Sequence, residues 1–258
     1  MKGIKKMSKD KNIFFLFILF IPLILLFIPF PAFAQSMTVD LGDAAGGTAT
    51  GRLIQLVVLM TVITLAPGIL MMVTSFMRII IVLSFLRSAL GLQQTPPNQV
   101  LISLALFLTM FIMTPAFEQA YKEGLKPLMN EQISQDQAFE RIGAPFHEFM
   151  LKHVREKDLS LFVAMSPGLT IEKPEDTPYR VLIPAFMISE MKRAFEIGFL
   201  IFIPFVIIDM LVASVLMAMG MMMLPPVMIS LPFKLIFFVL VDGWYMICGS
   251  LIKSFGTV

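Results

Sequence analysis

The sequence predicts an all-α membrane protein: a polytopic bundle of helical hairpins with a small helical extracytoplasmic region. Its 258 residues are 57% hydrophobic and only 15% charged, whereas a soluble domain is about 45–50% apolar and about 25% charged. Long apolar stretches recur along the chain, and about 20 such residues make a helix that crosses a ~30 Å hydrocarbon core. The formal net charge of +2 is not gathered into a patch, which argues against a dedicated nucleic-acid binder.

The N-terminal residues are predicted to be a processing signal followed by a tail. Five lysines precede a nearly uniform apolar stretch at 12–30, and an A-x-A site ends at Ala34. This pattern predicts a secretory signal peptide at residues 1–34, and an uncleaved anchor is the alternative. Residues 35–52 are small, polar and rich in glycine, so we expect a flexible extracytoplasmic tail there.

The rest of the chain is predicted to form two membrane helix pairs around one polar region. The first helix pair occupies residues 53–117, the extracytoplasmic helical region 118–196, and the second pair, with a methionine-rich loop, 197–258. The four spans are predicted at residues 53–73, 100–117, 197–224 and 235–252. A proline-bearing turn at 225–234 joins the last two spans.

Within the polar region, the pattern Ser134-Gln-Asp-Gln137 is a capping box that starts a helix. We expect a break in that helix at residues 143–145, because they read Gly-Ala-Pro.

The distribution of basic residues predicts the orientation of the spans. The loop after the first span carries Arg78 and Arg87 and no acid, and the loop after the third carries Lys234 and no acid. The polar region 118–196 has 10 Lys and Arg against 13 Asp and Glu, a net charge of −3. Because cytoplasmic loops are enriched in Lys and Arg, both short loops are predicted to be cytoplasmic, and the polar region and both termini of the mature chain extracytoplasmic.

The most unusual feature is the run MAMGMMMLPP, which begins at Met217. Five of its residues are methionines: Met217, Met219, Met221, Met222 and Met223. Methionine is unbranched, flexible and polarizable, so a dense patch suits a surface that must seal and still deform. Gly220, Pro225 and Pro226 are predicted to set the geometry of this loop. The alternative is an apolar helix end that happens to use methionine.

Charged residues in or beside the spans are a second group of candidates. Asp209 and Asp242 fall within predicted spans three and four, and a carboxylate there is costly enough to suggest a function. They could form a proton or ion relay, or they could pair structurally with Lys234, Arg78 or Arg87; the structural interpretation is favoured.

The start of the third span is also charged. Glu190, Lys192, Arg193 and Glu196 lie there and are interpreted as subunit-packing residues or as a solvated helix face. Glu190 could pair with Arg193 or with a neighbouring subunit.

No sequence pattern supports catalysis or a bound cofactor. The chain lacks a G-x-S-x-G elbow, a P-loop and an H-E-x-x-H motif. His147 and His153 are six residues apart, which is not zinc-ligand spacing on one helix face. We therefore predict no enzyme activity, no cofactor and no metal.

Four segments together resemble one family. They are MRIIIVLSFLRSALG at 77–91, PPNQVLISLALFLTMF at 96–111, FEIGFLIFIPFVIIDMLVASVLMAMGMMMLPP at 195–226 and ISLPFKLIFFVLVDGW at 229–244. They resemble the flagellar biosynthetic protein FliP family, whose injectisome relatives are SctR-type export-gate subunits. The resemblance covers the chain from about residue 53 onward.

The resemblance implies a core subunit of the flagellar type III protein export gate, in the inner membrane at the flagellar basal body. Five such subunits are expected to assemble with FliQ and FliR type subunits and to associate with FlhA and FlhB type components. The resemblance also implies that the helices lie largely above the plane of the inner membrane once the gate is assembled, so that the four predicted spans describe the inserted precursor. The family's methionine-rich loop, here centred on Met221, Met222 and Met223, would be a gasket around a pore for unfolded export substrates. The alternatives are an injectisome gate, or an ion or solute transporter that uses Asp209 and Asp242.

Overall fold

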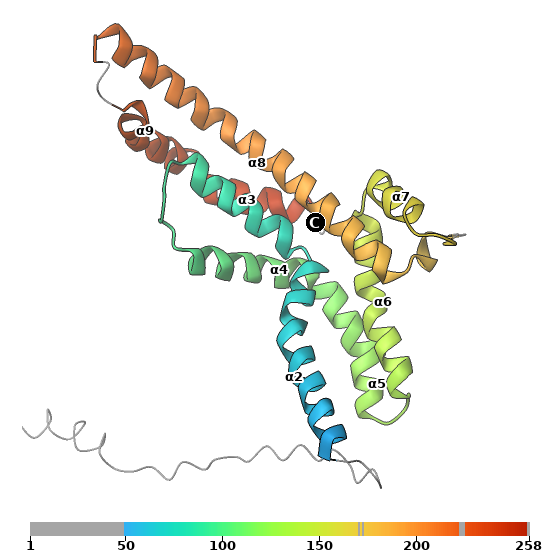
Figure 1. Ribbon diagram of the computed structural model, residues 1–258. Coiled ribbons are helices and arrows are strands. Elements are labelled where there is room, and N and C mark those ends of the chain that lie inside the picture. The colour runs from blue at the N-terminus through green and yellow to red at the C-terminus, as the bar shows by residue number, and fades with distance from the viewer. Residues whose placement is uncertain (1–48, 170, 172, 222–224, 257–258) are drawn as a thin grey trace, which may run out of the picture. The chain divides into compact units, whose positions relative to one another are not determined.

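The computed structural model describes residues 49–169, 171, 173–221 and 225–256, and Gln55–Val258 forms one compact unit. Every regular element in these ranges is helical (Figure 1), which confirms the all-α class. The predicted signal peptide, most of the predicted tail, and Met222 and Met223 lie outside the described residues.

Two helices replace the predicted first span and the loop after it. Helix α2 covers Ala49–Met72 and α3 covers Phe76–Ala89, and the segments Leu56–Met72 and Phe76–Ala89 are bent by 70°. The predicted loop after the first span is therefore wrong over α3. Apolar residues such as Ile79 and Val82 recur at helical spacing there and are fully buried, so packing forms the helix despite its two arginines.

The second predicted span is longer than expected. Helix α4 (Asn98–Ala120) continues through a π-helical turn, η1 (Tyr121–Leu125), into α5 (Lys126–Met129). Helix α6 (Gln135–His153) then begins at the predicted capping box, in which Ser134 accepts from the Gln137 backbone N–H. The break predicted around Pro145 is wrong: α6 continues through this buried proline and packs against α4 and η1.

A single 40-residue helix organises the rest of the chain. After α7 (Glu156–Ala164) and η2 (Pro174–Asp176), helix α8 runs without interruption over Tyr179–Ala218, a length of about 60 Å. Helix α3 lies along it, and α6, α7 and α9 (Pro226–Leu240) also contact it (Figure 1). The predicted boundary at 196/197 falls inside this helix.

The last predicted turn and span also differ from the structure. Helix α9 starts at Pro226, where a proline fits the first helical turn because its missing N–H has no helical partner to lose. The predicted turn at 225–234 is therefore wrong. Helix α10 (Gly243–Lys253) is bent by 63° from α9, because Asp242 between them takes a left-handed conformation with φ +50°.

Two of the described helices, α8 and the continuous segment Asn98–Met129, are each long and apolar enough to cross a membrane. The number rises to four if the bent pairs α2/α3 and α9/α10 each count as one span.

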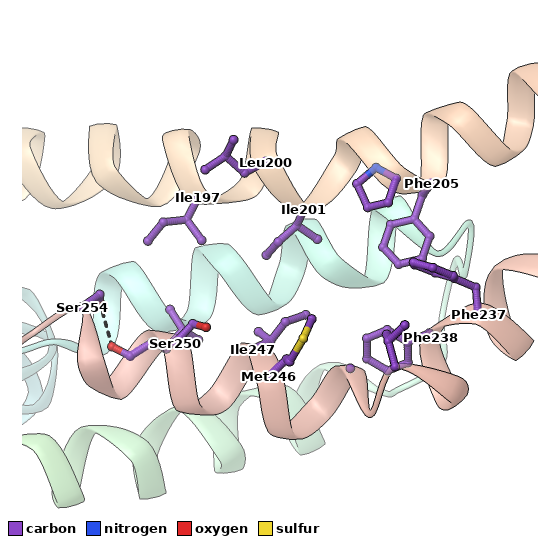
Figure 2. A pocket seen from close by; sticks show the side chains of 14 residues that line it. Ile197, Leu200, Ile201, Phe205, Phe237, Phe238, Met246, Ile247, Ser250 and Ser254 are labelled. Atoms are coloured by element: carbon purple, nitrogen blue, oxygen red, sulfur yellow. Dashed lines mark hydrogen bonds between the residues drawn. The ribbon is translucent and has the colours of Figure 1, made fainter. Parts of the chain in front are cut away.

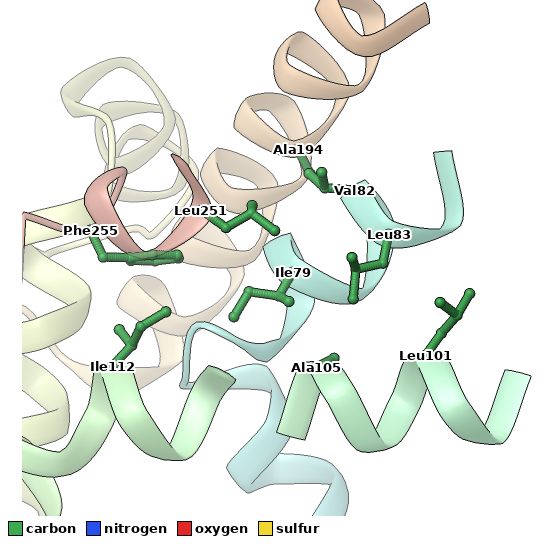
Figure 3. Close-up of a cluster of buried hydrophobic side chains, with 9 residues drawn as sticks. All are labelled: Ile79, Val82, Leu83, Leu101, Ala105, Ile112, Ala194, Leu251 and Phe255. Atoms are coloured by element: carbon green, nitrogen blue, oxygen red, sulfur yellow. The ribbon is translucent and has the colours of Figure 1, made fainter. Parts of the chain in front are cut away.

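The main hydrophobic core lies where α3 meets α4, α8 and the end of the chain. Figure 3 shows side chains from these elements facing one another across the cluster. Its buried members are Ile79, Val82, Leu83, Leu101, Ala105, Ile112, Ala194, Leu251 and Phe255. The contact of α3 with α8 depends on Gly198, because a Cβ atom there would lie 2.5 Å from Cδ2 of Phe85.

Candidate functional site

The methionine-rich segment begins at the end of α8. Gly220 has φ +74°, and two backbone bonds close the helix: Gly220 N–H donates to Met217 O and Met221 N–H donates to Leu216 O, both at 3.0 Å. This is a Schellman motif, which needs a left-handed residue and so favours glycine. Met217, Met219 and Met221 are 60%, 62% and 39% exposed, so the helix end presents flexible apolar side chains outside the core.

The prolines define the other side of this connection. Pro225 takes an extended conformation as the N-cap of α9, and Pro226 is its first helical residue. Since a proline ring fixes φ, these two residues restrict how α9 leaves the segment. We call α8, α9 and the connection between them the methionine hairpin.

An ion pair between a buried lysine and an aspartate whose side chain is 30% exposed joins the two helices of the methionine hairpin. Lys234 Nζ on α9 donates to Asp209 Oδ2 on α8 at 2.6 Å and to Ala89 O at 3.2 Å. Ser230 Oγ donates to the other oxygen of Asp209. The lysine is only 3% exposed. Asp209 is eight residues, or about 12 Å, before Met217 along α8, so the pair fixes the helices below the exposed methionines and ties them to the end of α3.

Arg78 and Glu190 form a second ion pair, between α3 and α8, in which both side chains are buried. Arg78 Nε donates to Glu190 Oε2 at 2.8 Å, and Nη2 donates to Oε1. Both side chains are at most 1% exposed. Arg78 Nη1 also donates to Ser254 Oγ at 2.9 Å, and its Cζ lies 3.7 Å from the ring centroid of Phe255. Since every bond satisfies part of a buried charge, this cluster fixes α3, α8 and the end of the chain together.

These pairs correct the basis of the predicted orientation. Arg78 and Lys234 were assigned to cytoplasmic loops, but both are buried in helices and paired with acids. Glu190 pairs with Arg78 and not with Arg193. Arg87 remains near a connection, where its guanidinium donates to Pro96 O at 3.3 Å and to Asn98 Oδ1.

The remaining predicted charges are less enclosed. Lys192 and Glu196 form an i,i+4 pair at 3.6 Å with both side chains more than half exposed. Arg193 between them is half-buried. Asp242, predicted inside a span, instead lies exposed at the break between α9 and α10.

Sequence reasoning missed a polar cluster at the start of α7. Asp158 accepts from Arg155 Nε and Nη2, both at 2.8 Å, and from Ser189 Oγ on α8 at 2.6 Å. Burial alone would raise the pKa of Asp158, but the bonds from Ser189 and Arg155 outweigh it and lower that pKa. The i,i+3 spacing of Arg155 and Asp158 was visible in the sequence, whereas Ser189, 31 residues further on, was not a visible partner.

An apolar groove of about 510 Å³ lies between α8 and the α9–α10 pair. Figure 2 shows Ile197, Ile201 and Phe205 on one side facing Phe238 and Ile247 on the other. Among the residues that the structure describes, no three His, Cys, Asp or Glu side chains gather as a metal site. The groove and the exposed faces of α8 and α9 thus offer apolar contact.

The chain is similar to known proteins over most of its length. The sequence model of the FliP family matches residues 59–251. Flagellar biosynthetic protein FliP of Caulobacter vibrioides is 59% identical over 228 residues, which cover 88% of this chain and 85% of that protein.

Two further relatives carry the same name. FliP of Bacillus subtilis is 60% identical over 78% of this chain and 91% of its own length, and FliP of Aquifex aeolicus is 45% identical over 86% and 93%. The chain therefore belongs to the FliP family and is a membrane-embedded subunit of the flagellar protein export apparatus.

Proposed function

We propose that the chain forms and gates a polypeptide-conducting pore of the flagellar type III export gate, with the methionine hairpin as its seal. The observation that carries this proposal is the exposure of Met217, Met219 and Met221 at a helix end that a Schellman motif and two prolines fix. These side chains are apolar, have three rotatable bonds each and make no specific polar bond that a passing chain would have to break.

The seal would work by excluding water. A ring of apolar side chains closes a narrow pore because water leaves a hydrophobic constriction. Unfolded export substrates differ in every side chain, and thioethers that repack can part around them and close again. No catalytic step is needed in this subunit, and the energy for export comes from other components.

A ring requires several copies. We propose a homo-oligomer, a pentamer as the family resemblance implies, together with FliQ and FliR type subunits and FlhA and FlhB type components. The exposed apolar residues of α8 and α9 and the groove beside α10 would contact neighbouring subunits. The assembly would reside in the inner membrane as a multi-pass protein of the flagellar basal body.

The test uses a strain that lacks the gene and carries either the intact gene or a variant. Replacing Met221, Met222 and Met223 together with alanine is expected to let ions leak through the closed gate and slow growth, with export partly kept. Flagellin and hook protein in the medium and membrane ion permeability are measured together. Met165→Ala is the matched control, because Met165 is 72% exposed but lies outside the methionine hairpin.

Unchanged permeability in the triple variant, with normal protein amounts, would contradict the gasket. Failure of the intact gene to restore flagellin secretion would contradict the export role itself. Normal flagella in the deletion strain together with loss of another secretion system would instead indicate an injectisome.

A further inference from the structure

The end of the described chain is anchored unusually deeply. Phe255, which follows α10, is only 2% exposed, and Figure 3 shows it beside Leu251, across from Ile112 of α4. Arg78 donates to both the carbonyl oxygen and the hydroxyl of Ser254 at 3.2 and 2.9 Å. We call Ser254–Phe255 the C-terminal turn. Its contacts reach α3, α4 and α6, so its docking closes the main core.

His153, at the end of α6, lies against this turn. Its ring centroid is 4.5 Å from that of Phe149 and 5.3 Å from that of Phe255. Nδ1 lies 2.8 Å from Phe149 O, and Nε2 lies 3.4 Å from Phe255 O. Because the side chain is only 6% exposed, a proton added to this ring would have to be accommodated by the protein and not by water.

The buried charged groups around His153 already form ion pairs. Arg78 on α3 and Glu190 on α8 act on the ring with opposite signs, but they are paired with each other. Of the charges that follow in the chain, Arg155 and Asp158 form a pair, and Glu156 and Lys157 between them are exposed to solvent. No buried acid among these groups is left to balance a second cation at His153.

Two opposing effects decide the charge of the ring. A protonated imidazole would donate to both carbonyls, which favours the charged form, but burial away from water disfavours it. Burial is the larger effect and the pKa of His153 is lowered from its ordinary value of 6.5. Burial therefore favours the neutral ring in the docked turn.

We propose that His153 is the acid-sensitive element of a latch that holds the C-terminal turn on α3 and α6. When the turn opens, water reaches the ring and it can take up a proton; the protonated ring then opposes redocking, because the docked site is shielded from water. The acidity of the compartment that the C-terminal turn faces would set this equilibrium, independently of whether the methionine hairpin is a gasket.

Linkage fixes the sign and size of the effect. With an ordinary pKa near 6.5 in the open form, the ratio of open to docked turn rises between pH 7.5 and pH 5.5, and the limit is about tenfold if only the open form binds the proton. Hydrogen–deuterium exchange of the full-length protein in detergent, read on the peptide that contains Ser254 and Phe255, reports this ratio. Comparing variants at each pH removes the change in intrinsic exchange rate.

The chain has two histidines, which gives a matched pair of variants. His153→Gln cannot gain a charge, so its exchange should lose the pH effect, whereas His147→Gln should keep it. His147 contacts Thr177 O at 2.6 Å and is not part of the latch. The same pH effect in His153→Gln as in the wild type, or its loss in His147→Gln, would overturn the proposal.

A second measurement covers the case in which His153→Gln does not fold. In His147→Gln labelled with ¹³C-histidine, the single remaining ring signal is titrated by NMR. A midpoint below 6.5, with faster exchange of the C-terminal turn over the same pH range, supports the latch. A midpoint at or above 6.5, or a titration that leaves the exchange unchanged, overturns it.

Discussion

Arg78 and Glu190 are 112 residues apart in sequence and form a two-bond ion pair from which water is excluded. Removal of either partner leaves a buried charge without a counter-ion, which costs about 3–5 kcal/mol in comparable pairs. Glu190→Ala should therefore lower the free energy of unfolding by that amount and reduce the amount of protein in the membrane. Denaturant unfolding in detergent, followed by circular dichroism, measures the effect.

The neighbouring surface pair supplies the control for this prediction. Lys192 and Glu196 lie on the same helix with more than half of each side chain exposed, so Glu196→Ala should change the stability by about 0.5 kcal/mol or less. Equal effects of Glu190→Ala and Glu196→Ala on the free energy of unfolding would mean that the buried pair stabilises the protein no more than the exposed pair does.

Asp209 and Lys234 allow a choice between the structural pair and the ion relay. Asp209→Asn leaves the Lys234 ammonium buried next to a neutral amide and should strongly reduce flagellin secretion. If the pair is structural, adding Lys234→Met should restore part of the secretion, because the unpaired buried charge is removed. Secretion by the two single variants and the double variant is compared at equal protein amounts.

An ion relay predicts the opposite result for the same three variants. It needs the ionisable carboxylate itself, so the double variant would be as inactive as Asp209→Asn. Asp209→Glu should retain more function than Asp209→Asn under either hypothesis and shows that the site tolerates substitution.

Local patterns predicted the helical class and the capping box at Ser134, because each depends on residues close in sequence. They failed at Arg78 and Lys234, because the order of apolar and polar stretches in the sequence places both residues in loops. Each of these cations is buried because an acid on α8 meets it, 112 and 25 residues away. The helix break predicted at Pro145 was wrong for a related reason. The packing of α6 against α4 and α8 outweighs the local cost of the N–H group that proline lacks.

Gly220 gives a test of the hairpin geometry that does not touch a methionine. A Cβ atom there would meet no other atom within 4 Å, but φ is +74°, so Gly220→Ala introduces backbone strain alone. We expect a loss of roughly 1–2 kcal/mol and, if the hairpin is a gasket, increased ion permeability. Gly220→Asn should be milder, since asparagine tolerates the left-handed conformation.

Gly249 is the matched position for that variant. It lies inside α10, a Cβ atom there also has no neighbour within 4 Å, and its φ is not positive. Gly249→Ala should therefore stabilise the protein, by up to about 1 kcal/mol, and leave permeability unchanged. Stabilisation by Gly220→Ala would show that the Schellman motif does not constrain this segment.

The polar cluster around Asp158 predicts how the stability of the folded protein changes in acid. The bonds from Ser189 and Arg155 hold the pKa of Asp158 below its ordinary value in the folded protein, so the unfolded chain binds the proton more readily. The stabilisation is then fully present above the ordinary pKa of 3.8 and is lost as the pH falls through the lowered one. Ser189→Ala should raise the pKa of Asp158 and shift acid unfolding to higher pH.

Acid titration followed by circular dichroism measures this shift, and two further variants interpret it. Ser160→Ala removes an exposed hydroxyl on the same helix, one that donates only to Lys157 O, and should leave the acid midpoint unchanged. Asp158→Asn cannot titrate, so adding Ser189→Ala to it should produce no further shift of the midpoint. An undiminished shift in that double variant would assign the effect of Ser189 to packing on α8 and not to the carboxyl group of Asp158.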